Sequence, residues 1–299
     1  MISDFIMKRV VKFAGQAMRT PVLRRPDDYG MDYEEVYFQA PDGVTLEGWY
    51  MPATTKSSKV VICNHFSPGN RYGYAGHLRG YRNFGGFEVN FIPKYKALTE
   101  AGYNVFAYDL RNHGLSGQSH NGGYNVGLFG YRDVIGSLNY IRNREDTKEM
   151  DIHLHSVCLG GNATLVAMRR HPEAFEDVKS MMLIQPLSSD VTAQTISNML
   201  RMPKKGPELY EKYYRQIWGF RGDDVTPRTD AEFVSMPTFV TQVREDTMTT
   251  PDDVQAIYDA IPVNDKKLFW IEGMKQRFRG YTYYSENPQQ MIEWYNSKS

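Results

Sequence analysis

Cys158 stands where a strand pattern gives way to a helix pattern, in a frame suited to nucleophilic chemistry. Residues 151–168 read as an alternating apolar strand, a tight turn and a run rich in Ala, Leu and Val. The turn has the frame Ser156-x-Cys158-x-Gly160-Gly161, a G-x-S-x-G nucleophile elbow with Cys for Ser and Ser156 for the first Gly. The N-terminus of the following helix would stabilise the thiolate form of the cysteine. The pattern predicts a nucleophilic Cys158, and the alternative is a small buried apolar residue.

Strand and helix patterns alternate along the chain around this cysteine. Strands are expected at 33–38, 45–51, 59–63, 104–109, 180–185, 237–243 and 267–271, and before Cys158; helices are expected after it and at 88–101, 126–144, 252–261 and 288–296. A hairpin followed by such alternation predicts an α/β fold with a mostly parallel eight-stranded sheet and helices on both faces. The loops after the parallel strands should meet at one edge of the sheet, where ligand sites lie in such folds.

Three regions are expected from the order of these elements. Residues 1–32 form a helical extension, residues 33–187 with 236–299 form the core, and residues 188–235 form a helical lid insertion interrupted by prolines. The N-terminal helix is amphipathic, and it could pack on the body, form a homodimer contact or cover the active site. The Tyr- and Arg-rich segment 70–87 is a second candidate lid.

Four segments in this order resemble the α/β-hydrolase superfamily, from about Tyr33 to the C-terminus. They are the strand and loop at 60–66, the segment 101–117 with a variant of the D-x-R-G-H-G-x-S turn, the elbow at Cys158, and the strand and loop at 236–246. A Cys at the elbow is similar to the nucleophile of dienelactone hydrolases. The resemblance implies an oxyanion hole made by the backbone N–H groups of Leu159 and Phe66.

The resemblance also implies a catalytic acid and a histidine, and only the acid is present. Asp246 has the position of the triad acid, with Glu245 and Asp252 as lesser options. The histidine position falls at Gln276 or Arg277, and the chain has no His after His171.

Other groups near the expected site could take over part of the histidine's task. Asp246 could pair with Arg277 or Lys275, and either cation would stabilise a Cys158 thiolate. His65, in the loop after the third strand, is expected to be structural, and its alternative is to reach the substrate or Cys158. His113 is likewise expected to be structural.

The composition of the chain limits which partners and cofactors are expected. The 299 residues carry 35 basic and 35 acidic side chains and a formal net charge of +0, which gives no reason to expect nucleic acid as a partner. Two cysteines are too few for a disulfide framework, so a reducing, cytoplasmic setting is expected. No apolar run would span a bilayer, and no metal-ligand spacing or dinucleotide fingerprint stands out, so no metal or cofactor is expected.

These features favour an enzyme that uses Cys158 on an activated carbonyl, an ester, lactone or thioester, of a small-molecule or carrier-bound acyl substrate. Hydrolysis and acyl transfer both remain open, and the missing His favours transfer because water needs a base. One alternative is a decayed hydrolase that binds a small hydrophobic ligand. Another is hydrolysis through a substitute base, either His65 or a carboxylate.

Overall fold

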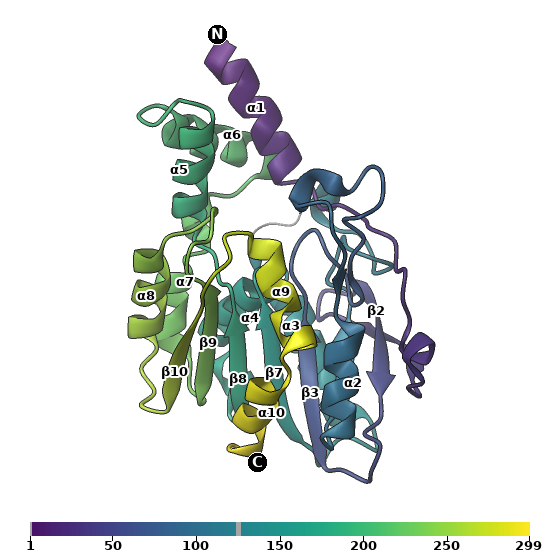
Figure 1. The fold of residues 1–299 in the computed structure, drawn as a ribbon. Helices are drawn as coiled ribbons and strands as arrows, with labels where there is room; N and C mark the ends of the chain where they lie inside the picture. The colour runs from purple at the N-terminus through teal and green to yellow at the C-terminus, as the bar shows by residue number, and fades with distance from the viewer. Residues whose placement is uncertain (1, 124–126) are drawn as a thin grey trace.

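The structure, a computed structural model, describes residues 2–123 and 127–299 and is built on an eight-stranded sheet (Figure 1). The strand order is β1-β2-β6-β3-β7-β8-β9-β10. The strands are β1 (Glu34–Gln39), β2 (Thr45–Met51), β3 (Lys59–Asn64), β6 (Asn104–Tyr108), β7 (Asp151–Val157), β8 (Val178–Ile184), β9 (Thr238–Val243) and β10 (Lys266–Ile271). Only β2 runs antiparallel to its two neighbours, so the predicted mostly parallel sheet is confirmed.

Central strands are buried along nearly their whole length, which explains their sequences. β3 (KVVICN) and β6 (NVFAY) are almost continuously apolar because helices cover both faces of the sheet. The helices α2 (Ile92–Glu100), α9 (Arg277–Glu286) and α10 (Gln289–Asn296) pack on one face; α3 (Tyr131–Asn143), α4 (Leu159–Arg170) and α8 (Pro251–Ala260) pack on the other (Figure 1).

Two of the expected helices begin several residues later than predicted, and one further helix was not predicted. The helix expected from residue 88 begins at Ile92, because Val89–Asn90 forms the short strand β5 with β4 (Gly73–Tyr74). The helix expected over 126–144 spans Tyr131–Asn143, and position 126 lies outside the described residues. α9 was not predicted, since its sequence RFRGYTYYSE has few strong helix formers and is held by burial instead.

The N-terminal helix α1 (Ile2–Ala14) packs on the helices inserted between β8 and β9 (Figure 1). These are α5 (Ser189–Met199), α6 (Gly206–Trp218) and the short α7 (Pro227–Asp230). Met7 and Val11 are fully buried, and Trp218 Nε1 donates to the Val11 carbonyl at 3.2 Å. Gly15 passes so close to Trp218 that a Cβ would lie 2.1 Å from its Nε1. The structure therefore shows that the N-terminal helix packs on the insertion.

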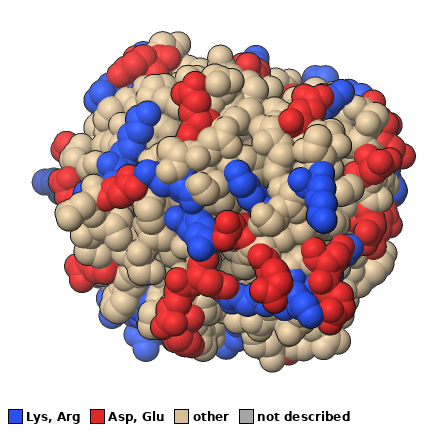
Figure 2. All heavy atoms as spheres, turned by 90° about the horizontal axis from the view of Figure 1, so that it is seen from below, with Lys and Arg blue, Asp and Glu red and all other residues tan. Residues whose placement is uncertain are grey.

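The amino ends of the parallel strands form the opposite end of the molecule. Figure 2 views the molecule from below and shows Lys and Arg interspersed with Asp and Glu. The ion pairs Lys179–Asp151 (3.3 Å) and Lys298–Asp265 (2.6 Å) lie near this end. Among the described residues, no helix has the length and apolarity needed to cross a membrane.

Candidate functional site

Cys158 occupies the sharp turn between β7 and α4 with φ 51° and ψ −107°. A non-glycine residue in this conformation costs roughly 1–3 kcal/mol, and such strain is concentrated at functional sites. Gly160 allows the close approach of the third-strand loop, because a Cβ there would lie 2.6 Å from the Asn64 carbonyl group. Ser156 stands where the elbow pattern usually has its first glycine. Its hydroxyl has hydrogen-bond partners there, since it contacts Asn64 Nδ2 and Thr164 Oγ1 at 2.9 Å each. The side chain of Cys158 is 8% exposed and faces a cavity.

The expected oxyanion donors lie in two loops that a hydrogen bond joins. Gly160 N–H donates to the His65 carbonyl at 3.0 Å, which brings the residue after Leu159 against the residue before Phe66. Leu159 is the first residue of α4, where N–H groups have no intrahelical acceptor. Among the described residues, no acceptor is found for the Phe66 N–H either. Both donors are therefore free to bind an oxyanion.

His65 is fully engaged in holding these loops. Its Nε2 accepts from the Leu110 N–H at 2.9 Å, so its Nδ1–H donates to the Phe66 carbonyl at 2.7 Å. Burial, reinforced by the nearby charge of Arg71, lowers the pKa of His65 to about 4. With both nitrogens engaged in this way, His65 has a structural arrangement rather than that of a general base.

His113 is held in a similar way. It donates from Nδ1 to the Arg111 carbonyl (2.9 Å) and accepts at Nε2 from Ser67 Oγ (3.0 Å). Burial lowers the pKa of His113 to about 3.

Arg277 is one of the two residues expected at the histidine position. Its Nη1 is ion-paired with Asp246, and both side chains are at most 5% exposed. Asp246 also accepts from Gln242 Nε2 at 2.8 Å and from the Met248 N–H at 2.9 Å. The other guanidinium nitrogens donate to the Gln185 carbonyl and, at 2.7 Å, to the Tyr281 hydroxyl. Burial opposes the charged form of Arg277, but the charges of Asp246, Tyr281 and Cys158 together hold its pKa well above the usual value.

The other candidates near this position have different surroundings. Gln276 caps α9 by accepting from the Phe278 N–H at 2.6 Å, and its amide lies against Gly85. Lys275 pairs with Glu245 at 3.2 Å on the surface. Asp252 is exposed in the first turn of α8. Of these residues and Arg277, only Arg277 lines the cavity.

Tyr281 is a site residue that the sequence analysis did not single out. Its ring stacks on Phe66 at a centroid distance of 4.2 Å, and its hydroxyl accepts from Arg277 Nε. Burial raises the pKa of Tyr281 well above its usual value. The charge of Arg277 opposes this rise, whereas the interaction with Cys158 adds to it. Arg277 and Tyr281 are four residues apart and so lie on one helical face, a signal that depends on predicting α9.

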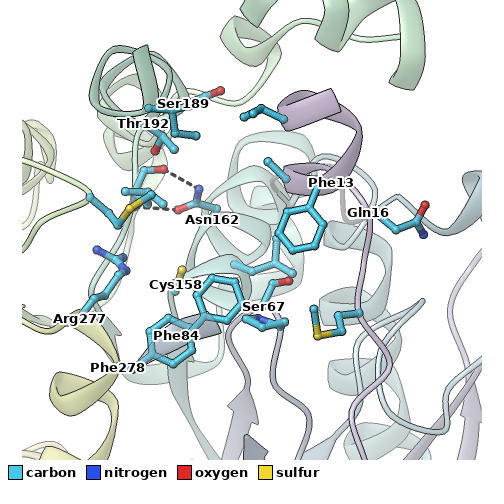
Figure 3. A pocket seen from close by; sticks show the side chains of 18 of the residues that line it. Phe13, Gln16, Ser67, Phe84, Cys158, Asn162, Ser189, Thr192, Arg277 and Phe278 are labelled. Carbon is cyan, nitrogen blue, oxygen red and sulfur yellow. Dashed lines mark hydrogen bonds between the residues drawn. The ribbon is translucent and has the colours of Figure 1, made fainter. Parts of the chain in front are cut away.

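The cavity above Cys158 has a volume of about 510 Å³, within the roughly 300–1,000 Å³ typical of small-molecule sites. Figure 3 shows Cys158, Ser67, Phe84 and Phe278 below Phe13 and Thr192. α1 supplies Arg9, Val10, Phe13 and Ala14; α5 supplies Ser189, Thr192 and Ile196; α6 supplies Tyr210. The N-terminal helix and the insertion thus form the upper walls of an apolar chamber over the thiol. No group of His, Cys, Asp or Glu in the described parts of the chain could hold a metal ion.

The segment 70–87 contributes less to this chamber than expected. Arg71 is buried away from it and pairs with Asp109 at 3.0 Å and with Glu47 at 2.5 Å. Tyr72 and Tyr74 are also buried, and Phe84 is the residue of this segment that lines the cavity. Arg71 therefore does not reach the cavity, because its charge is paired with carboxylates inside the core.

Sequence comparisons relate the chain to proteins of this architecture. A family model described as "alpha/beta hydrolase fold" matches residues 73–217. The uncharacterized protein YfhR of Escherichia coli K12 is 28% identical over 193 residues, which cover 63% of this chain and 60% of YfhR. The matched part of the chain thus spans less than two thirds of that relative.

Solved structures agree with the same fold. An esterase of Pyrococcus furiosus superposes with a TM-score of 0.68 and 18% identity, covering 95% of this chain and 96% of the esterase. An acylaminoacyl peptidase of Pyrococcus horikoshii gives a TM-score of 0.60 and 18% identity, covering 90% of this chain and 42% of the peptidase. The chain has the α/β-hydrolase fold, and these matches support the resemblance to that superfamily. At such identities the likeness to solved structures shows the fold alone.

Proposed function

We propose that the protein catalyses acyl-group chemistry, hydrolysis or acyl transfer, with Cys158 as the nucleophile. The observation that carries this proposal is the placement of Cys158: a strained turn holds its thiol on the floor of an apolar cavity. A packing role for the thiol alone would need neither the strained turn nor the chamber.

In the proposed reaction the Cys158 thiolate attacks the carbonyl of an ester, lactone or thioester. The N–H groups of Phe66 and Leu159 bind the oxyanion, and an acyl-thioester enzyme forms. Arg277, paired with Asp246, brings a buried positive charge to the wall of the cavity. The apolar walls suit the acyl part of a small-molecule substrate or of a carrier-bound one. The names of the structural neighbours, an esterase and an acylaminoacyl peptidase, are in keeping with acyl chemistry.

The reaction would take place in a reducing compartment, and we propose a cytoplasmic setting. Both cysteines are free thiols, and a nucleophilic thiolate must stay reduced to act.

A second candidate function is ligand binding without turnover. It is favoured by the Asp246–Arg277 pair, because Asp246 is already bound to a cation and to two further donors and does not orient a histidine. The same cavity would then hold a small hydrophobic ligand.

Covalent trapping separates the two functions. The protein is mixed with p-nitrophenyl esters of increasing acyl length, and mass spectrometry follows the acyl adduct. An adduct in wild type and Cys63→Ala but not in Cys158→Ala supports the enzyme. Cys63 is a matched control because burial raises its pKa to about 12, which keeps this thiol unreactive. Thermal stabilisation by an ester with no adduct and no turnover would instead support the binding protein.

A further inference from the structure

We propose that Tyr281 is a catalytic residue that carries the proton a triad histidine would carry. It acts as general acid when the acyl-enzyme forms and as general base when the acyl-enzyme is released. This inference rests on the proposed function of Cys158.

The geometry places a continuous chain of groups behind the thiol. Tyr281 and Cys158 line the same cavity, and the charge of Cys158 is one of the causes that raise the pKa of Tyr281. Arg277 Nε donates to the Tyr281 oxygen at 2.7 Å, and Asp246 holds the Arg277 guanidinium from the other side. The order Cys158–Tyr281–Arg277–Asp246 therefore replaces nucleophile–histidine–acid.

Arg277 can serve only as a fixed partner of this tyrosine. Its remaining nitrogens are bound to Asp246 and to the Gln185 carbonyl, so the Nε–H points at the phenol oxygen. A donated hydrogen bond and a positive charge both stabilise a phenolate relative to a phenol. Because the Tyr281 oxygen accepts this hydrogen bond, its own proton is free to point at Cys158.

The proton balance closes over a full turnover. The Cys158 thiolate attacks the carbonyl carbon, and the C=O electron pair moves to the oxygen. When the intermediate collapses, the bond to the leaving alcohol breaks, and the alcohol oxygen takes the Tyr281 proton. The products of this half-reaction are an acyl thioester and a phenolate paired with Arg277. Water or an acceptor alcohol then gives its proton to the phenolate as its oxygen attacks the thioester, and the C–S bond breaks to restore the thiolate.

Burial supports the second half of this cycle. The raised pKa of Tyr281 means that the residue rests as a neutral acid and that its phenolate, once formed, is a strong base. His65 and His113 do not compete for this task, because backbone and Ser67 groups occupy their nitrogens.

Tyr281→Phe tests the inference because it removes the hydroxyl and keeps the ring stacked on Phe66. p-Nitrophenolate leaves without a proton, so we expect this variant to keep a burst of about one nitrophenol per enzyme. With esters of simple alcohols, the departing alcohol takes the Tyr281 proton and leaves the phenolate, so both acylation and deacylation depend on the hydroxyl. For these esters the steady-state turnover of Tyr281→Phe should fall by about 10²–10⁴-fold relative to the wild type, the usual contribution of a general acid–base group. Hydroxylamine, a stronger nucleophile than water, should restore turnover of the trapped acyl-enzyme.

Tyr284→Phe is the matched control in the same helix. Tyr284 is also buried, and its hydroxyl contacts Thr241 Oγ1 at 2.7 Å, outside the residues that line the cavity. This variant should keep both the burst and the turnover. Equal steady-state rates in Tyr281→Phe and Tyr284→Phe would overturn the role of Tyr281 while leaving Cys158 as the nucleophile. Absence of any adduct in the wild type would overturn the proposed function itself, and the role of Tyr281 with it.

Discussion

Asp246 follows β9 where a triad acid is expected, and its carboxylate is paired with the guanidinium of Arg277 instead of a histidine. Both side chains are nearly inaccessible to solvent. A buried charge is tolerated only when its partner and its hydrogen bonds are in place. The pair therefore links the stability of this edge of the sheet to the electrostatics of the site around Cys158.

Asp246→Asn should destabilise the fold, because it leaves the Arg277 charge buried without a counter-charge. Loss of one partner of a buried pair typically costs about 3–5 kcal/mol. Urea denaturation would measure the free energy of unfolding. Glu245→Gln is the control at the neighbouring position, since Glu245 pairs with Lys275 on the surface and should change stability by less than about 1 kcal/mol.

The double variant Asp246→Asn/Arg277→Met completes the test. Removing both charges should recover a large part of the stability lost in Asp246→Asn, because no uncompensated charge remains. If the two single changes simply add, the pair is not coupled and this interpretation is wrong.

His65 should make stability fall as the pH falls. Its folded pKa of about 4 lies below the unfolded value of about 6.5. Between these values the unfolded chain binds more protons, so the free energy of unfolding decreases by up to about 1.4 kcal/mol per pH unit from this residue. The contribution is complete above pH 6.5 and lost as the pH approaches 4. Unfolding of wild type and His65→Asn, followed from pH 7 to pH 4, would measure the difference in slope.

His171→Asn serves as the comparison for this pH series, because the His171 side chain is 43% exposed. The slope of this variant shows how much of any change comes from replacing a histidine by an asparagine. A His65→Asn slope equal to that of wild type would contradict a buried neutral His65.

The sheet and the elbow were predictable, and the chemistry behind the elbow was predictable only in part. Strands such as β3 and β6 stand out because both of their faces are buried, which leaves an unbroken apolar run. Cys158 stands out because small residues must flank its turn. Asp246 and Arg277 were named as a possible pair, and Gln276 could not be separated from Arg277 without the start of α9.

The sequence analysis did not identify Tyr281, again because helix α9 was not predicted. Its position beside Cys158 depends on α9, whose residues have weak helix propensity and are held by contacts across the sheet. The chamber likewise depends on the packing of α1 against α6, more than 190 residues along the chain, which no local pattern encodes.

The wall supplied by α1 should control how well an apolar acyl chain binds. Val10 faces the cavity, so Val10→Glu places a carboxylate inside an apolar chamber and should weaken binding of long-chain p-nitrophenyl esters by about tenfold or more. Acetyl esters, which do not reach this wall, should be affected less. The KM across a series of acyl lengths measures the effect.

Lys12→Glu is the control for the wall of α1. Lys12 is exposed on the same helix and does not line the cavity, so the same carboxylate there should leave the dependence on chain length unchanged. Equal effects of the two variants would mean that α1 does not bound the substrate site.

Lys94 is a buried lysine whose removal should stabilise the protein. It is 2% exposed, and its ammonium lies 3.9 Å from the centre of the Phe91 ring, with no carboxylate in ion-pair range among the described residues. Burial lowers its pKa to about 8, which the nearby Cys63 only partly opposes. The lowered pKa is equivalent to a penalty of about 3 kcal/mol on the charged form at pH 7.

Lys94→Met keeps an unbranched apolar side chain that is one atom shorter and removes this penalty, so the free energy of unfolding at pH 7 should rise by up to about 3 kcal/mol. In the wild type the unfolded chain binds more protons between pH 8 and 10.5, so the wild type should gain stability across that window and the difference between the two proteins should shrink. Lys96→Met, two residues further along α2 and 43% exposed, should show neither effect. A Lys94→Met variant that is less stable than the wild type at pH 7 would show that the contact with Phe91 outweighs the cost of burying the charge.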